Sequence, residues 1–251
     1  MTDEDHTATA FHAGLDGVTF TSHGSRLLGG FYTAAGATPR PTAILLHGLP
    51  GVEKSLDVAY ALRDLGWNCL YFHYRGCWGS DGVYSLTHLA DDTRAAVEWT
   101  LRQPSVDATR LVLIGGSAGG HAALTYAAAD PRIRATVALC PAIDPRTFAF
   151  PAALADDFAS MLSGITGDEL RAQWQALPSV VDVAPALASR PVLMVTADRD
   201  ELFPPAHYAS IGAALPGLSW ARAADADHAF STCRPWLVRT VTEWLVSTLG
   251  V

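Results

Sequence analysis

Short apolar runs of strand-forming character alternate with longer segments of helical periodicity along most of this chain. The runs at 42–48, 68–74 and 110–116 have the composition of buried strands, and the segments 54–65 and 87–103 have helical spacing. Strands that alternate with helices predict a parallel sheet wrapped by helices. With right-handed crossovers, this order of elements gives an α/β fold with one doubly wound, mostly parallel sheet of about eight strands, whose functional sites lie at the carboxyl ends of the strands.

Residues 145–188 interrupt the alternation. They contain no convincing strand, several prolines and scattered aromatic residues. A segment of this length within a strand–helix pattern is more typical of an inserted cap than of a structureless loop. We therefore expect residues 16–251 to form a single domain with 145–188 as a small cap, and the acidic residues 1–15 to form a flexible N-terminal tail.

The charge and the apolar runs exclude several classes of function. The chain has 251 residues and a formal net charge of −8, without a Lys/Arg cluster, so nucleic acid is not an expected partner. No run reaches the roughly 18 apolar residues of a membrane span. The first residues lack the features of a secretory signal, and the four cysteines form no C-x-x-C pair. We expect a cytoplasmic protein with buried free thiols.

A serine lies among glycines at the end of one predicted strand. Gly115, Ser117 and Gly119 form the pattern G-x-S-x-G. In this pattern a strand turns sharply into a helix and holds the serine hydroxyl outward in a strained conformation. Glycines beside the serine let neighbouring backbone approach closely. A glycine-rich turn that only closes a strand–helix loop has the same local composition, so the surrounding residues must decide.

Candidate partners for the serine follow two later strands. A serine hydroxyl needs a base within hydrogen-bond reach, and that base must be oriented by a third group. Asp198 and Asp200 follow the strand within 190–197, and His228 follows the last predicted strand. Both aspartates are candidate acids. Asp227, next to His228, should point to the opposite side of an extended backbone.

Two other histidines need a separate explanation. His47 lies at the end of the strand predicted at 42–48, and His121 lies in the first turn of the helix that follows the serine. A lone histidine has many uses besides catalysis, and we expect structural or solvated roles for both.

The segments that carry these residues together resemble those of the α/β-hydrolases, from about Val18 to the C-terminus. They are LLHGLPG, HYRGCWGSDG, GGSAGG, TADRDELFP and DHAF. The resemblance implies that Ser117 is a nucleophile, His228 its general base and Asp200 the acid. The acid loop departs from the family pattern, because Ala197 stands where glycine is usual. The resemblance also assigns the oxyanion donors to the backbone N–H groups of Leu49 and Ala118.

The activity implied by this resemblance is that of a serine hydrolase, which forms an acyl-enzyme and uses no metal or organic cofactor. A carboxylic ester of a small or medium-sized molecule is the expected substrate. A peptidase or amidase is the alternative, and Asp156-Asp157 in the cap could hold a substrate amino group. A biosynthetic acyl-transfer or cyclisation enzyme, or a non-catalytic binder, could use the same pocket, because fold does not determine function.

Apolar pocket walls are expected from the cap and from the glycine-rich loop before it. The same side chains could instead form the core of the cap or pack under that loop. The candidates are Trp78, Phe148, Phe150, Phe158, Met161 and Trp174.

Overall fold

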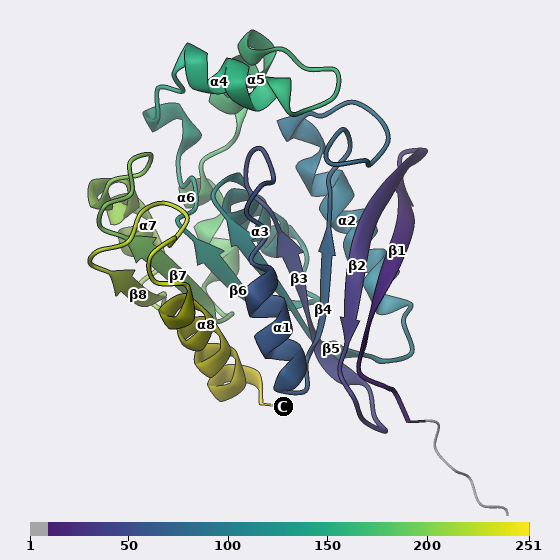
Figure 1. Ribbon diagram of the computed structural model, residues 1–251. Coiled ribbons are helices and arrows are strands. Elements are labelled where there is room, and N and C mark those ends of the chain that lie inside the picture. The colour runs from purple at the N-terminus through teal and green to yellow at the C-terminus, as the bar shows by residue number, and fades with distance from the viewer. Residues whose placement is uncertain (1–9, 251) are drawn as a thin grey trace, which may run out of the picture.

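One eight-stranded sheet forms the centre of the computed structural model, which describes residues 10–250 (Figure 1). The strand order is β1-β2-β4-β3-β5-β6-β7-β8. β1 pairs antiparallel with β2, β2 pairs antiparallel with β4, and the remaining neighbours are parallel. The strands are β1 (Gly14–Ser22), β2 (Ser25–Thr33), β3 (Arg40–Leu46), β4 (Asn68–Phe72), β5 (Val106–Gly116), β6 (Ile133–Leu139), β7 (Val192–Ala197) and β8 (Ser219–Ala223). The predicted doubly wound, mostly parallel sheet is confirmed.

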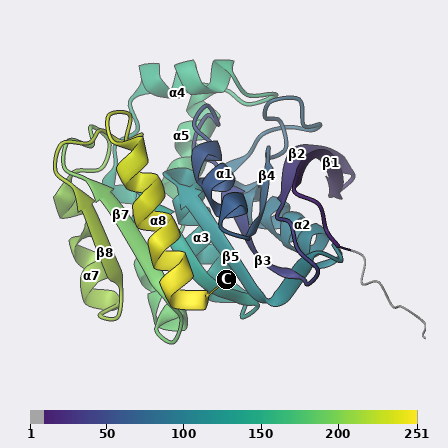
Figure 2. The same cartoon turned by 60° about the horizontal axis from the view of Figure 1, so that its bottom comes forward.

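Helices cover both faces of the sheet. α1 (Leu56–Asp64) and α8 (Arg234–Leu249) contact each other and lie across one face (Figure 2). α2 (Leu89–Leu101), α3 (Ala118–Ala129) and α7 (Ala209–Ala214) lie on the other (Figure 1). The central strands are therefore buried on both sides, which explains why they read as continuous apolar runs and not as alternating patterns.

The two faces of β5 show how one strand serves two cores. Val112 and Ile114 pack into the core beneath α1 and α8, whereas Leu111 and Leu113 pack into the core beneath α2 and α3. Successive side chains of a strand point to opposite faces, so this apolar run fills both layers. The carboxyl end of β5 is thereby held rigidly at the centre of the sheet.

Residues 145–188 form the helical insertion, a run of short helices between β6 and β7. It contains α4 (Ala152–Ser160), α5 (Gly167–Ala176) and α6 (Val180–Val183), with 3₁₀ turns at Pro145–Thr147 and Ala184–Leu187. α4 and α5 lie beyond the carboxyl ends of the parallel strands (Figure 1). The segment has no strand, as predicted.

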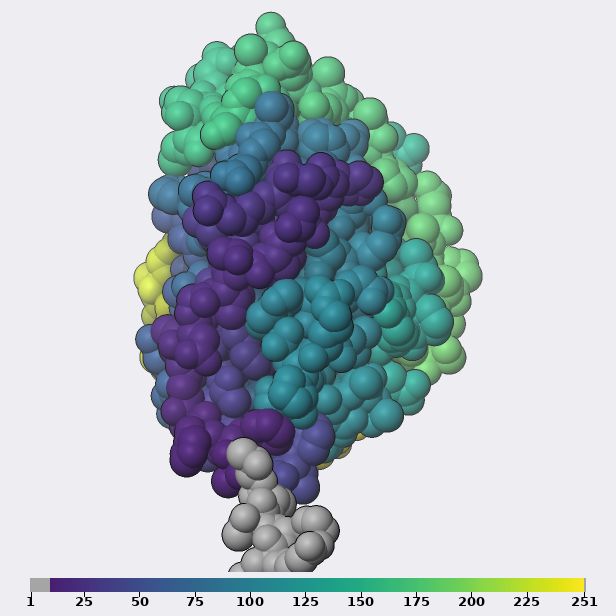
Figure 3. Space-filling view, turned by 90° about the vertical axis from the view of Figure 1, so that its right-hand side faces the viewer, coloured from purple at the N-terminus to yellow at the C-terminus, as the bar shows by residue number. Residues whose placement is uncertain are grey.

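The helical insertion is tied to the loop that follows β4. The backbones of Cys77 and Leu162 form an isolated antiparallel β-bridge. The Ser163 N–H donates to the Gly76 carbonyl, and the Ser163 carbonyl accepts from the Tyr84 N–H. In Figure 3 the insertion rests on this loop, above the β1–β2 hairpin. The loop itself is anchored by a buried ion pair, in which Arg75 Nε lies 2.6 Å from Asp92 Oδ1 of α2.

Part of the expected N-terminal tail is paired with the rest of the fold. Residues 1–9 of the expected tail lie outside the described residues. Phe11 exchanges two backbone hydrogen bonds with Gly36, and β1 already begins at Gly14. The boundary predicted at residue 15 is therefore wrong, because backbone pairing orders residues whose side chains carry no strand pattern.

All four cysteines are free thiols. Cys69, Cys77 and Cys140 are buried free thiols, and Cys233 is partly exposed. None of the helices formed by residues 10–250 combines the length and the apolar character needed to cross a bilayer.

Candidate active site

Ser117 occupies a strained turn between β5 and α3. Its backbone angles are φ 53° and ψ −120°, outside the regions that residues with side chains prefer, and such a residue costs on the order of 1–3 kcal/mol. Hydrogen bonds hold both of its backbone polar groups. Its N–H donates to the Leu139 carbonyl at 2.9 Å, and its carbonyl accepts from His121 N–H at 3.1 Å.

The glycines around Ser117 are required by close backbone contacts. A Cβ on Gly115 would collide with the carbonyl oxygen of Gly119, and a Cβ on Gly119 would collide with that of Leu46. A Cβ on Gly48 would lie 2.9 Å from the Ser117 Cβ. The ends of β3 and β5 and the first turn of α3 therefore meet at this serine at distances that exclude any side chain at these positions.

Asp200 and His228 are joined by a hydrogen bond. Asp200 Oδ2 lies 2.8 Å from His228 Nδ1, and Asp200 Oδ1 accepts from the N–H groups of Leu202 and Phe203, both at 2.8 Å. Burial alone would raise the pKa of the Asp200 carboxyl, but His228 and these two N–H groups lower it below its ordinary value. The carboxylate is thus ionised and fixed, and it orients the imidazole.

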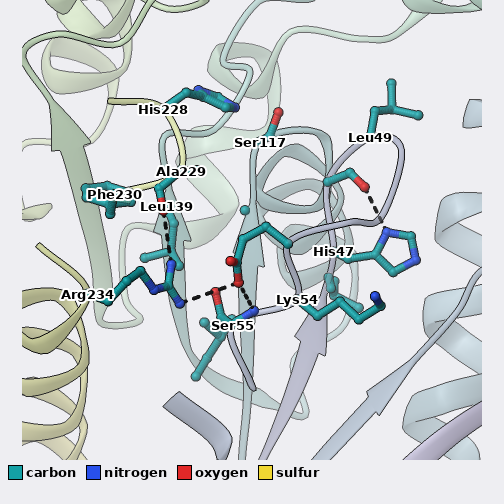
Figure 4. Close-up of a pocket in the computed structure, with 15 residues that line it drawn as sticks. His47, Leu49, Lys54, Ser55, Ser117, Leu139, His228, Ala229, Phe230 and Arg234 are labelled. Carbon is teal, nitrogen blue, oxygen red and sulfur yellow. Dashed lines mark hydrogen bonds and ion pairs between the residues drawn. The ribbon is translucent and has the colours of Figure 1, made fainter. Parts of the chain in front are cut away.

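Ser117 and His228 line the same cavity (Figure 4). Within the described part of the chain, the Ser117 hydroxyl has no hydrogen-bond partner, so the serine–histidine contact is open in this structure. Hydrogen bonds of this kind are often long in a free enzyme and tighten when substrate binds. The structure places the three predicted residues after the carboxyl ends of β5, β7 and β8, with the contact between Asp200 and His228 formed.

The other carboxylates near these loops have different partners. Asp198 forms an ion pair with Arg222 on β8. Asp227 accepts a 2.7 Å hydrogen bond from the N–H of Ser231 and so stabilises the following turn. Of the two candidate acids, only Asp200 contacts His228.

The N–H groups of Leu49 and Ala118 lie on the two backbone segments that flank Ser117. Ala118 is the first residue of α3, where N–H groups have no partner within the helix and the helix dipole is positive. Leu49 follows Gly48, where an added Cβ would lie 2.9 Å from the Ser117 Cβ. No acceptor for either N–H is found among residues 10–250, which leaves both free to donate.

His47 and His121 have structural contacts. His47 is buried, and its Nδ1 lies 2.8 Å from the Gly48 carbonyl oxygen. Burial lowers the pKa of His47 to about 3, so the ring is neutral and Nδ1 donates to that carbonyl. His121 is also buried, and its Nε2 lies 2.9 Å from the Pro178 carbonyl oxygen of the helical insertion.

His207 makes contacts that the sequence did not predict. Its Nε2 accepts a 2.8 Å hydrogen bond from the N–H of Ile143, and its ring stacks on Phe203 with centroids 4.7 Å apart. It therefore joins the segment between β6 and the helical insertion to the loop that carries Asp200. No local pattern marks this histidine, because its hydrogen-bond partner Ile143 lies 64 residues away in sequence.

The expected pocket walls differ from the observed ones. Phe148, Phe150, Phe158 and Trp174 pack against one another, and Trp174 also stacks on Phe203. These aromatic rings form the core of the helical insertion, which was the alternative to their lining a substrate pocket. Met161 and Trp78 are each more than two-fifths exposed, and the indole N–H of Trp78 donates to the Pro50 carbonyl. Among the described residues, none of the six lines the cavity beside Ser117.

That cavity is small, about 80 Å³. Ser117 and His228 lie at one end of it, and Lys54, Ser55 and Arg234 at the other (Figure 4). Its lining comes from the loops after β3 and β8, the end of β5 and the start of α8. The sequence did not predict that Glu53, Ser55 and Arg234 line this cavity, because they come from segments that only the fold brings together.

One group of potential metal ligands occurs in the described residues. Ligand atoms of Cys140, Asp200 and His228 lie within 4.8 Å of one another. Asp200 and His228 already bond to each other, and burial raises the pKa of the Cys140 thiol, which favours its protonated form. The arrangement fits a carboxylate–imidazole pair beside a protonated thiol.

Comparison with known proteins gives a family match over most of the chain. The model of the prolyl oligopeptidase family matches residues 57–251. The protein Rv2307c of Mycobacterium tuberculosis is 36% identical over 121 residues, which are 47% of this chain and 43% of that protein. The quorum-quenching protein AidA of Acinetobacter baumannii is 29% identical over 133 residues, 51% of this chain and 44% of AidA. The chain thus spans less than half the length of these curated relatives.

Solved structures share the whole fold. Est1E from Butyrivibrio proteoclasticus, with ferulic acid bound, has a TM-score of 0.79 and 21% identity, and the match covers 93% of this chain and 100% of Est1E. At this identity the likeness establishes the fold, which is that of the α/β-hydrolases.

The buried His47 gives a pH prediction. The unfolded chain protonates this residue near its ordinary pKa of about 6.5, whereas the folded chain does so only near 3. The unfolded state therefore binds more protons below pH 6.5, so His47 makes the fold progressively less stable as the pH falls from about 6.5 towards 3. Heteronuclear NMR at about pH 5 should show a neutral His47 ring with the proton on Nδ1. A charged ring at that pH would contradict this assignment.

Proposed function

The chain belongs to the prolyl oligopeptidase family within the α/β-hydrolases, and we propose that it is a serine hydrolase that cleaves carboxylic esters through a Ser117-His228-Asp200 triad. The observation that carries this proposal is the combination of a strained, outward Ser117 with an imidazole fixed by a buried carboxylate at 2.8 Å. A serine is nucleophilic only when a neighbouring base takes its proton, and this arrangement supplies such a base.

In the first step, His228 Nε2 takes the proton of the Ser117 hydroxyl as Oγ attacks the ester carbonyl carbon. The carbonyl oxygen becomes negative, and the free N–H groups of Leu49 and Ala118 donate to it. Removal of one such donor typically costs about 2.7–4 kcal/mol of transition-state stabilisation. The tetrahedral intermediate collapses with loss of the alcohol, which receives the proton from His228, and an acyl-Ser117 ester remains.

In the second step, water attacks the acyl carbon and gives its proton to His228. The bond to Ser117 Oγ breaks, Oγ regains the proton, and the carboxylic acid leaves. Asp200 remains ionised throughout and stabilises the charged imidazole. The helical insertion, which lies beyond the carboxyl ends of the strands, is proposed to cover the substrate as a cap.

Ester cleavage is favoured over peptide cleavage by the carboxylates around the site. Asp156 and Asp157 are exposed on α4 and do not line the cavity beside Ser117. Among the described residues, Glu53 is the one carboxylate of that lining, and it is paired with Arg234. Neither arrangement offers a free carboxylate to hold a substrate amino group beside the serine.

Turnover of p-nitrophenyl esters of increasing chain length tests the proposal. The wild-type protein should hydrolyse the short and medium esters, and Ser117→Ala should lose this activity while keeping its circular dichroism and melting temperature. Hydrolysis of peptide p-nitroanilides in preference to esters would favour the peptidase. A folded wild type without activity on either series would contradict the proposal.

The two aspartates of the acid loop provide a matched pair. Asp200→Asn keeps the size of the side chain but removes the charge that fixes His228, so kcat for ester hydrolysis should fall by about 10³–10⁴-fold. Asp198→Asn removes an ion pair with Arg222 on the partly exposed surface and should change kcat by less than about threefold. Steady-state kinetics measures both. A loss with Asp198→Asn as large as that with Asp200→Asn would refute the assignment of the acid.

A further inference from the structure

The cavity beside Ser117 has a polar end that the mechanism above does not use. Lys54, Ser55 and Arg234 lie there, opposite Ser117 and His228 (Figure 4). Glu53 also belongs to the lining of this cavity. Its volume of about 80 Å³ is enough for several water molecules, each of which needs at least about 10–15 Å³. Pockets for larger organic ligands usually have about 300–1,000 Å³.

This cavity borders a hollow on the protein surface. The hollow has a volume of about 440 Å³ and shares Glu53, Lys54, Ala229 and Arg234 with the lining of the inner cavity. The side chains shared by the two linings therefore lie between the surface hollow and the cavity beside Ser117 and His228. None of the residues that line either space comes from the helical insertion at 145–188.

An ion-pair group lies between the two spaces. Arg234, at the start of α8, forms an ion pair with Asp57 of α1 and lies 3.5 Å from Glu53 Oε1. Its Nη1 also donates to the Ala229 carbonyl at 3.1 Å. The Glu53 side chain is about half exposed, and exposed ion pairs are weak. Glu53 also accepts a hydrogen bond from the Ser55 N–H, and it is the most exposed side chain of this group.

We propose that this passage supplies the water that hydrolyses the acyl-enzyme, separately from the side on which the acyl group binds. The inference rests on the proposed function. A water in the cavity needs two to four polar partners. The Ser55 hydroxyl, which has no other partner among the described residues, and the charged groups of Glu53 and Arg234 provide them.

The passage ends where the water is consumed. From the cavity, a water molecule reaches His228 and the acyl carbon on Ser117 without passing the helical insertion. It gives one proton to His228 as its oxygen bonds to the acyl carbon, and Ser117 Oγ leaves with that proton. The carboxylic acid and free Ser117 result. An acyl group under the insertion therefore does not block the water.

Two variants that narrow the passage from opposite walls test this inference. Ala229→Leu adds bulk between the two spaces. Ser55→Asn adds bulk at the polar end, where asparagine tolerates the observed φ of 54°. Ala229→Ser is the matched small control. The rate of fluorophosphonate labelling at Ser117 in each variant verifies that the serine and His228 remain competent.

For p-nitrophenyl acetate, kcat/KM reports steps up to acylation, whereas kcat also reports deacylation. We expect both blocking variants to keep kcat/KM within about twofold, to lose about tenfold in kcat with a parallel fall in KM, and to accumulate acetyl-Ser117 in acid-quenched mass spectra. Ala229→Ser should behave as the wild type.

Other outcomes separate the failure of this inference from the failure of the proposed function. Unchanged kcat and no accumulated acyl-enzyme in both blocking variants would show that water enters elsewhere and would overturn the passage. A fall in kcat/KM would mean that the cavity holds part of the ester and would also overturn it. A wild type without Ser117-dependent turnover would instead refute the proposed function itself.

Discussion

The close approach of three backbone segments at Ser117 is the constraint on which the rest of the site depends. The end of β3, the end of β5 and the first turn of α3 meet so tightly that side chains at Gly115 and Gly119 would collide with carbonyl oxygens. This crowding holds Ser117 at φ 53°, and the hydrogen bonds of its N–H and carbonyl keep it there. The two apolar cores on either side of β5 supply the rigidity, because buried strands in close-packed layers cannot yield to relieve the strain.

The same packing explains how three distant loops form one site. Parallel strands bring their carboxyl ends to one edge, so the loops after β5, β7 and β8 converge although 111 residues separate Ser117 from His228. Burial makes the hydrogen bonds there strong, and Asp200 has donors on both of its oxygens. The helical insertion and the polar cavity reach this edge from different directions, which separates the proposed acyl side from the proposed water side.

Sequence reasoning predicted the parts of the molecule that local patterns encode. The strand–helix alternation predicted the sheet, and it placed Asp200 and His228 each at the carboxyl end of its own strand. The structure shows that these strands, β7 and β8, are neighbours and that the two side chains are joined. Asp198 remained a competitor until its partner Arg222 on the adjacent strand was seen. The pocket walls were not predictable, because an aromatic residue in an insertion packs equally well on its neighbours or on a substrate. His207 and Arg234 were missed for a related reason: their partners come from distant loops, and no spacing in the chain indicates them.

The most direct test of the central claim is covalent labelling with a fluorophosphonate probe followed by mass mapping. Such a probe reacts with a serine only when a base and an oxyanion site activate it. We expect a single modification at Ser117 in the wild-type protein and none in a folded Ser117→Ala variant. Absence of labelling in the folded wild type, or labelling that persists at another residue in the variant, would contradict the proposal that Ser117 is an activated nucleophile.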